Sequence, residues 1–330
     1  MGCFIQADSG VESRLVGELT GIAAMNANTS IKPTAIDETE SPFLLDNEST
    51  FQAWKQRKLQ LRQALSPLEQ FPLSPATGIN LQYATRIKNQ IDAFNFIVFE
   101  SDPTLSRSEF LQLNQCLGMR RIDQNPGAED DAVTLLQGLP DGDPRANYIP
   151  YTDRAMNWHT DGYYNPPERN IKAFSLFCVT AAAEGGANFL LDHEYVYLLL
   201  RDTDPESLAV LMSPDFMCVP ANETDDTIMR DEQSGPVFAV DPENGRLHMR
   251  YTSRPRHLIW KEDSRSQHAL ECLREILHDS DAIVDLHLSA GLGLICNNIL
   301  HGRQAYRDTD QDKRLLYRAR FLDSIDPRPA

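Results

Sequence analysis

The sequence predicts a β-rich α+β fold: a double-stranded β-helix (jelly roll) core with flanking helices. From about residue 150 onward, short apolar segments rich in β-branched and aromatic residues are separated by hairpin-type turns. The chain has 330 residues, of which 41% are hydrophobic and 24% charged, the balance of a globular protein with a sizeable core. We therefore expect residues 1–45 to form an N-terminal arm or peripheral cover and residues 46–330 to form a single jelly-roll domain with helical insertions.

The first part of that domain mixes helix and strand signals. Apolar residues recur at helical spacing over residues 51–65, and Ser106 with Glu109 forms the capping box of a helix that continues to residue 117. Between these helices, residues 94–99 are apolar and rich in aromatic side chains, which predicts a buried strand.

Strand signals dominate the second part. Gly185-Gly186 marks one turn, and Asn244-Gly245 is typical of a tight hairpin. Two helices interrupt the strands, one that begins at Asp204-Pro205 and one over residues 264–278. The strands expected here are residues 171–180, 188–191, 236–241, 246–252, 292–299 and 314–321.

Composition limits the class of partner. A net charge of -17 and a pI near 4.8 make the surface repel phosphate backbones and anionic lipid, so we expect a small-molecule substrate and neither nucleic acid nor membrane as partner. The six cysteines are dispersed without a C-x-x-C pair, which favours reduced thiols and a cytoplasmic location. We find no apolar run long enough for a membrane span and no signal-peptide pattern. The oligomeric state stays open, a homo-oligomer included.

The first pattern that indicates chemistry is Trp158-His159-Thr160-Asp161-Gly162. On a strand, residues two apart point to the same side, so His159 and Asp161 can reach one metal ion. With His301 as a distant third ligand they would form a 2-His-1-carboxylate site, which leaves three positions open on Fe(II). Alone, H-x-D is a weak signal, and a solvated turn histidine beside an aspartate is the simpler interpretation.

A second pattern follows His301. Alternation over residues 314–321 places Arg314, Arg318 and Arg320 on one strand face. A solvent-facing polar side, or even a helix, would explain them as well. The functional interpretation is that one inward arginine forms a bidentate pair with a carboxylate of a bound diacid.

Taken together, residues from about 150 to 321 resemble the TauD/TfdA superfamily of Fe(II)/2-oxoglutarate dioxygenases. In that superfamily H-x-D, a distal His and R-x-x-x-R follow one another in this order. The resemblance implies that His159, Asp161 and His301 bind Fe(II), and that O2 and 2-oxoglutarate are co-substrates.

The same resemblance implies a site for 2-oxoglutarate. Arg314 would bind its distal carboxylate, and Arg318 would lie near its other end. Asn188 stands where that superfamily has the threonine of G-G-x-T, and it can still donate a hydrogen bond to 2-oxoglutarate.

Within the superfamily, the chain is most similar to CsiD-type glutarate 2-hydroxylases. The segments that carry this likeness are residues 159–162, 185–188, 238–241, 245–251 and 297–303. The resemblance implies hydroxylation of a small, carboxylate-bearing, glutarate-like substrate with release of succinate and CO2. The residues proposed to contact this substrate are Tyr163, Tyr164, Arg250, Arg254 and Arg256.

Two other function classes stay open at this stage: a jelly-roll protein that binds a metal or ligand without turnover, and a zinc-dependent hydrolase. Neither would release succinate. Asp192-His193-Glu194 looks like a helix start rather than a metal cluster, because three consecutive residues cannot face one point. The remaining histidines lack ligand-like spacing with a carboxylate and are expected at the surface or in packing: His248, His257, His268, His278 and His287.

Overall fold

The computed structural model describes residues 41–326, except 77, 126, 141, 147, 225–226 and 255–257. The described residues belong to one compact unit. Most of the predicted N-terminal arm, and Arg256 and His257, lie outside the described residues.

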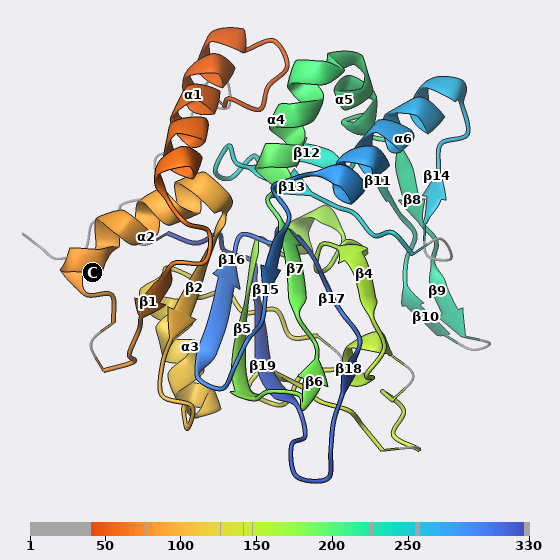
Figure 1. Ribbon diagram of the computed structural model, residues 1–330. Helices are drawn as coiled ribbons and strands as arrows, with labels where there is room; N and C mark the ends of the chain where they lie inside the picture. The colour runs from red at the N-terminus through yellow and green to blue at the C-terminus, as the bar shows by residue number, and fades with distance from the viewer. Residues whose placement is uncertain are drawn as a thin grey trace, which may run out of the picture. The chain divides into compact units, whose positions relative to one another are not determined.

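Two facing sheets form the centre of this unit (Figure 1). Apart from the parallel pair β1–β2, their neighbouring strands are antiparallel, as in the predicted jelly roll. The major sheet has the order β1 (Gln70–Pro72), β2 (Phe96–Glu100), β16 (Leu292–Cys296), β5 (Ala173–Thr180), β19 (Leu315–Phe321), β3 (Thr134–Leu136). The minor sheet has the order β15 (Val284–Leu286), β7 (Asn188–Leu191), β17 (Leu300–Arg303), β4 (Met156–His159).

Smaller strand groups surround these sheets. The predicted Asn-Gly hairpin is confirmed, since residues 238–240 pair with 247–249 and Gly245 has a φ of 67°. The remaining strands are β6 (Glu184–Gly185) with β18 (Tyr306–Arg307), β9 (Asn222–Thr224) with β10 (Thr227–Arg230), β12 (Phe238–Val240) with β13 (Leu247–Met249), and β8 (Met217–Val219) between β11 (Gln233–Gly235) and β14 (Ile259–Trp260).

The helices follow the predicted caps closely. Ser106 and Glu109 form the predicted capping box, and Asp192 and Asp204 each accept a hydrogen bond from the first turn of the helix that they precede. The helices are α1 (Glu48–Ala64), α2 (Leu81–Phe94), α3 (Arg107–Cys116), α4 (His193–Thr203), α5 (Pro205–Leu211) and α6 (Ser264–Asp279), with short 3-10 turns at Ile149–Tyr151 and Pro167–Arg169.

Several predicted boundaries were wrong by two or three residues; the strands expected over residues 292–299 and 246–252 end at Cys296 and Met249. The strand expected over residues 94–99 begins only at Phe96, because Phe94 is the last residue of α2. Asn95 ends that helix with a φ of 60°, a left-handed conformation that asparagine tolerates better than most residues. The apolar run therefore contains a helix end and a strand start.

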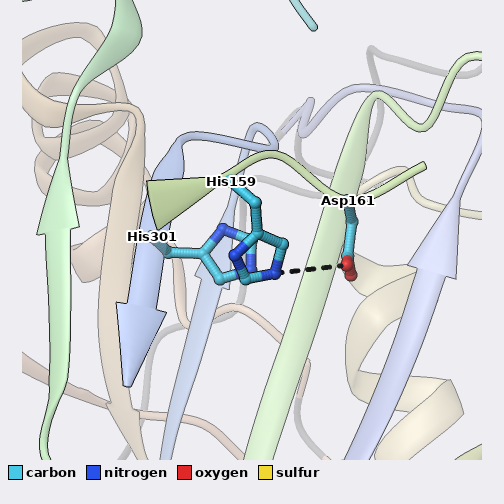
Figure 2. A group of neighbouring side chains, drawn as sticks. All are labelled: His159, Asp161 and His301. Carbon is cyan, nitrogen blue, oxygen red and sulfur yellow. Dashed lines mark ion pairs between the residues drawn. The ribbon is translucent and has the colours of Figure 1, made fainter. Parts of the chain in front are cut away.

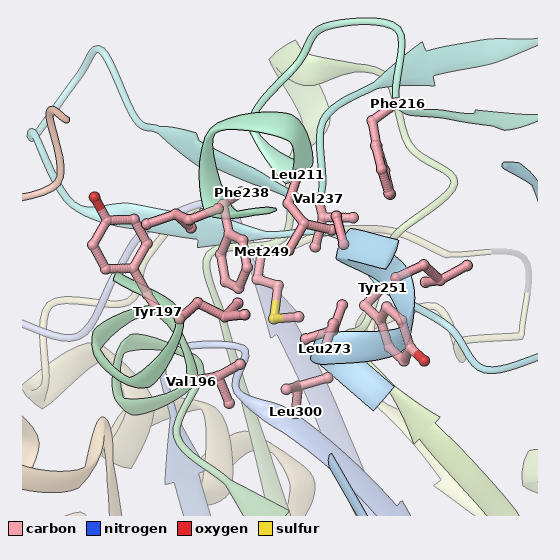
Figure 3. Close-up of a cluster of buried hydrophobic side chains, with 14 of the residues drawn as sticks. Val196, Tyr197, Leu211, Phe216, Val237, Phe238, Met249, Tyr251, Leu273 and Leu300 are labelled. Carbon is pink, nitrogen blue, oxygen red and sulfur yellow. The ribbon is translucent and has the colours of Figure 1, made fainter. Parts of the chain in front are cut away.

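Three apolar clusters hold these layers together. Phe174, Leu190 and Leu294 belong to the cluster that joins β5 and β16 of the major sheet to β7 of the minor sheet. A second cluster packs α2 and α3 against the major sheet. The third joins α4, α5, α6 and the β12–β13 hairpin to β7 and β17 of the minor sheet. Figure 3 shows part of this cluster, including Tyr197 and Leu300. Each fully buried large side chain contributes about 1.5–3 kcal/mol, so these clusters fix the positions of the strands that carry the site.

Two further observations complete the fold. Residues 315–321 form the strand β19, with a register shift at its start, so Arg314 lies just before the strand rather than inside it. No helix in the described part of the chain is both long and apolar enough to cross a membrane.

Candidate active site

Strand pairing brings two distant histidines together. His159 ends β4 and lies opposite His301 of the antiparallel neighbour β17, with 4.2 Å between the ring centroids. Asp161 was expected on the same strand as His159, but the strand ends at His159 and Asp161 begins the turn that follows. Gly162 continues that turn with a φ of 66°, where an added Cβ would lie 2.4 Å from Ile171.

Asn298 holds the backbone of Asp161 in place. Its Oδ1 accepts a hydrogen bond from the Asp161 amide at 2.8 Å, and its Nδ2 donates to the Asp161 carbonyl at 2.9 Å. The same Nδ2 donates to the Ile171 carbonyl at 2.7 Å. Asn298 carried no role in the sequence analysis, because a single asparagine beside a strand gives no signal of its contacts.

The side chains of His159, Asp161 and His301 converge (Figure 2). One ligand atom from each lies within 4.8 Å of the others, and His159 Nε2 is 4.0 Å from Asp161 Oδ1. Each histidine Nδ1 lies 2.9 Å from a backbone carbonyl two residues earlier, Asn157 or Ile299. A carbonyl can only accept, so Nδ1 carries the proton and Nε2 keeps a free lone pair.

The protonation states favour metal binding. Burial lowers the pKa of His159 to about 3, helped by the charge of His301, and burial also lowers the pKa of His301. For Asp161, burial by itself would raise the pKa, but the charges of Arg318 and Arg320 bring it well below its usual range. Two neutral imidazoles and one carboxylate therefore face the same point at neutral pH.

These residues fit a divalent metal ion. Asp161 Oδ2 is buried and has no hydrogen-bond partner among the described residues. An unpaired buried carboxylate oxygen is costly unless a ligand compensates it. A metal ion would provide that compensation.

Arg314, Arg318 and Arg320 lie inside the fold, which excludes the solvent-facing interpretation. Arg318 Nη1 lies 3.6 Å from Asp161 Oδ1, and Arg320 forms a buried ion pair with Asp123. Arg314 is 4% exposed, and its Nη1 has no hydrogen-bond partner in the described part of the chain. Its guanidinium lies 5.0 Å from the ring centre of Tyr306, a residue that the sequence analysis did not single out.

The glycine turn lies next to the Arg314 side chain. Gly186 has a φ of 75°, and an added Cβ there would lie 3.7 Å from Arg314 Nε. At Gly185, with a φ of 73°, an added Cβ would lie 2.4 Å from the Ala305 carbonyl oxygen. Asn188 is buried at the start of β7, where its Nδ2 donates to the Leu286 carbonyl at 3.5 Å.

Of the predicted substrate residues, Arg250 has a structural contact, and Arg254, Tyr163 and Tyr164 lie near the proposed metal site. Arg250 is buried, and its Nε donates to the Tyr163 carbonyl at 3.0 Å, so it supports the backbone that follows Asp161. Arg254 lies two residues after Thr252, which pairs with His159 in an isolated β-bridge. The charge of Arg254 contributes to the lowered pKa of His159. The rings of Tyr163 and Tyr164 meet edge to face at 5.2 Å.

Arg230 joins this group, although the sequence gave no signal for it. Its guanidinium lies 5.5 Å from the ring centre of Tyr164, and its buried Nε has no hydrogen-bond partner within the described residues. Its Nη2 donates to the Pro220 carbonyl at 2.6 Å. Strand β10, which carries Arg230, is distant in sequence from Tyr164, so only the tertiary structure brings them together.

A family model for the taurine catabolism dioxygenase TauD, TfdA family, matches residues 62–320. This chain belongs to the TauD/TfdA family. The match confirms the predicted enzyme class, a dioxygenase, and agrees with the jelly-roll fold described above. His159, Asp161 and His301 are a group that could hold a metal ion in such an enzyme.

Two curated relatives share the name uridine-5'-phosphate dioxygenase. One, from Streptomyces sp, is 35% identical over 175 residues, which are 51% of this chain and 62% of that protein. The other, from Amycolatopsis sp, is 30% identical over 183 residues, 52% of this chain and 63% of that protein. The chain thus spans less than two thirds of these relatives, and the narrower resemblance to CsiD-type glutarate 2-hydroxylases is not confirmed.

Solved structures agree on the fold. The non-heme iron oxygenase OrfP in complex with Fe, succinate and (3S)-hydroxy-L-Arg has a TM-score of 0.54 and 14% identity, covering 86% of this chain and 93% of that one. OrfP in complex with Fe has a TM-score of 0.53 at 14% identity, covering 84% and 92%. At this identity the likeness extends to the fold alone.

Proposed function

We propose that this chain hydroxylates a small anionic molecule and binds Fe(II) through His159, Asp161 and His301. The observation that carries this proposal is the convergence of two imidazole Nε2 atoms and a carboxylate at one buried point. Three such donors would cover one side of an Fe(II) ion and leave three positions open for co-substrate and O2.

When bound, Fe(II) and 2-oxoglutarate supply the oxidising chemistry, in which O2 converts 2-oxoglutarate to succinate and CO2 and adds one oxygen atom to a substrate C–H bond. The residues of the chain bind and orient the reactants. The backbone carbonyls behind His159 and His301 hold both rings in the orientation that ligation needs, and Asn298 fixes the turn of Asp161.

For 2-oxoglutarate we propose Arg314 as the partner of the distal carboxylate, with Arg318 nearer to the metal ligands and Asn188 as a hydrogen-bond donor. Burial with an unpartnered Nη1 supports this role for Arg314, because a buried guanidinium without a full set of acceptors is stabilised by an anion. The ion-pair distance from Arg318 to Asp161 supports its position beside the iron ligands.

For the substrate we propose an anionic group that contacts Arg254 and Arg230, with Tyr163 and Tyr164 as the adjacent wall. The chain as a whole is strongly acidic, so Arg230, which lies over the Tyr164 ring, and Arg254, whose charge acts on Tyr163 together with that of Arg230, form a local exception that attracts anions. The proposed group is a carboxylate, as in glutarate, or a phosphate, as in the uridine-5'-phosphate for which the curated relatives are named.

The direct test is succinate release by purified protein with Fe(II), ascorbate and 2-oxoglutarate. Glutarate and uridine-5'-phosphate are the two main arms, and uridine without phosphate is the neutral control. We expect faster succinate release with an anionic substrate than without substrate. No succinate under any condition would contradict the oxygenase proposal and favour a non-catalytic metal-binding protein or a hydrolase.

Two variants test the arginine roles separately. Arg314→Ala should raise the 2-oxoglutarate concentration for half-maximal rate by about 10- to 100-fold, since a charge-assisted contact contributes about 1.5–3 kcal/mol. Arg230→Ala should leave substrate-independent 2-oxoglutarate turnover intact and remove the stimulation by an anionic substrate. Arg307→Ala is the matched control, because Arg307 lies near Arg314 in sequence but its side chain is 70% exposed.

A further inference from the structure

A second group of potential metal ligands lies among the helices. Asp204 at the junction of α4 and α5 meets His268 and Cys272 of α6. His268 Nε2 is 3.1 Å from Asp204 Oδ2, Cys272 Sγ is 3.7 Å from the same oxygen, and Sγ is 3.6 Å from His268 Nε2. From its sequence spacing alone, His268 was expected to be a surface or packing residue, because no carboxylate lies at ligand-like spacing from it.

The three side chains are held on rigid elements. His268 and Cys272 are four residues apart on α6, so they lie on the same helix face. Asp204 caps α5, where its Oδ1 accepts a hydrogen bond from the Ser207 amide at 3.0 Å. Leu208 of α5 belongs to the same buried cluster as Leu273 of α6, and Figure 1 shows the two helices side by side. The cluster therefore depends on two packed helices and not on a loop.

We propose that Asp204, His268 and Cys272 form a Zn²⁺ site separate from the catalytic iron site. Zn²⁺ binds nitrogen at about 2.0–2.1 Å, sulfur at about 2.3 Å and carboxylate oxygen at about 2.0–2.2 Å, usually as a tetrahedron. Tetrahedral angles at those bond lengths separate the ligand atoms by roughly 3.3–3.6 Å. The three observed separations, 3.1, 3.6 and 3.7 Å, are close to these values, so little movement is needed.

The chemistry of the donors selects the metal. A thiolate, an imidazole and one carboxylate suit Zn²⁺, whereas Mg²⁺ and Ca²⁺ prefer oxygen alone. The His268 side chain is 65% exposed, which leaves a fourth position for water. The carboxylate of Glu275, whose charge acts on Cys272, adds a negative potential that favours a cation. Zn²⁺ bound here would cross-link α6 to the start of α5.

Cobalt provides a specific readout, because a cysteine thiolate bound to Co²⁺ gives a charge-transfer band in the near ultraviolet. The proposed iron ligands include no sulfur, so Co²⁺ bound there gives no such band. We expect metal-stripped full-length protein to develop the band on titration with Co²⁺ and to lose it when Zn²⁺ is added. Cys272→Ser should abolish the band, and Cys218→Ser, at another partly exposed cysteine, should retain it.

A second variant and a metal count complete the test. His268→Ala changes a largely exposed side chain, so it should fold normally and also lose the band. With Zn²⁺ alone, the wild type should bind one equivalent more than either variant, while His301→Ala should keep the cobalt band. Succinate formation with Fe(II) should be unchanged in Cys272→Ser. A wild-type protein without the band, or a band that persists in both variants, would show that the cluster is only a hydrogen-bonded helix contact.

Discussion

Strand β19 presents two arginines, two residues apart, to two different buried carboxylates. Arg320 pairs with Asp123, whose other oxygen accepts a hydrogen bond from Arg169 at 2.7 Å. Arg318 lies 3.6 Å from Asp161 Oδ1, and Oδ2 of Asp161 has no partner among the residues that the structure describes. Two arginines on one strand face thus lie beside two different carboxylates: one with both oxygens paired, and one with an oxygen that has no partner among the described residues.

The difference distinguishes a structural ion pair from an open ligand. Both oxygens of Asp123 are engaged, so this carboxylate stabilises the fold and offers nothing to a metal ion. One oxygen of Asp161 is left unpaired at a cost in stability, which is typical of a functional position. Burial and nearby charge are common to both sites, so neither feature alone distinguishes the proposed metal ligand Asp161 from Asp123.

The largest effect should follow from Asp161→Ala. Without this carboxylate the iron would keep only two protein ligands, so bound Fe(II) and succinate formation should fall to background while the fold persists. Iron content, the succinate assay and circular dichroism would measure these outcomes, with the exposed Asp310→Ala as control. Unchanged iron content would mean that Asp161 resembles Asp123 after all.

The opposite result is expected from Asp123→Ala. Removing one partner of a buried pair leaves Arg320 uncompensated, which should lower the free energy of unfolding by about 3–5 kcal/mol. Glu184→Ala, which removes an ion pair exposed on both sides, should change it little. Chemical denaturation measures both, and the Asp123 variant should retain Fe(II) binding under conditions where it is folded. Loss of iron from the folded variant would break the comparison.

Asn298→Ala tests how Asp161 is held. Losing the hydrogen bonds to the Asp161 backbone should weaken Fe(II) binding by about 10- to 100-fold, the usual effect of removing a residue that supports a metal ligand. Asn297→Ala is the matched control, because Asn297 is also buried but its amide bonds to Asn95 and Ile325. If both variants weaken iron binding equally, the effect is general destabilisation and not positioning.

A pH-dependent effect is expected at the imidazole of His248. Burial lowers its pKa to about 3, with His193 and Arg250 adding to the shift. Between the ordinary value of 6.5 and about 3, the unfolded chain binds a proton that the folded chain does not. Stability should therefore fall as the pH drops through this range, by up to about 1.4 kcal/mol per pH unit.

His248→Gln should flatten this part of the pH–stability profile, measured by denaturation between pH 7 and pH 4. His278→Gln is the control, because the His278 side chain is 86% exposed. Equal slopes for wild type and His248→Gln would show that this histidine does not titrate between the two states.

Local sequence patterns predicted most helices and strands, and they indicated two of the three proposed metal ligands, His159 and Asp161. Helix caps at Ser106 and Asp204, the Asn-Gly hairpin and a strand over residues 315–321 were predicted correctly because each depends on residues close in sequence. The predicted alternation did not extend to Arg314, which lies before the strand. The H-x-D pattern likewise involves residues close in sequence, His159 and Asp161. The domain boundary near residue 45 and the roles of the site residues stay predictions.

Only the tertiary structure decided which of these residues meet. His301 reaches His159 because β17 pairs with β4, and Asp204 reaches His268 because two helices share one apolar cluster. No local pattern indicated Arg230, and the segment 297–303 that carried the family resemblance assigned no role to Asn298. Periodicity predicts which face of a helix or strand is buried. The segment that covers this face is selected by packing among segments far apart in the chain, so a local sequence pattern does not predict it.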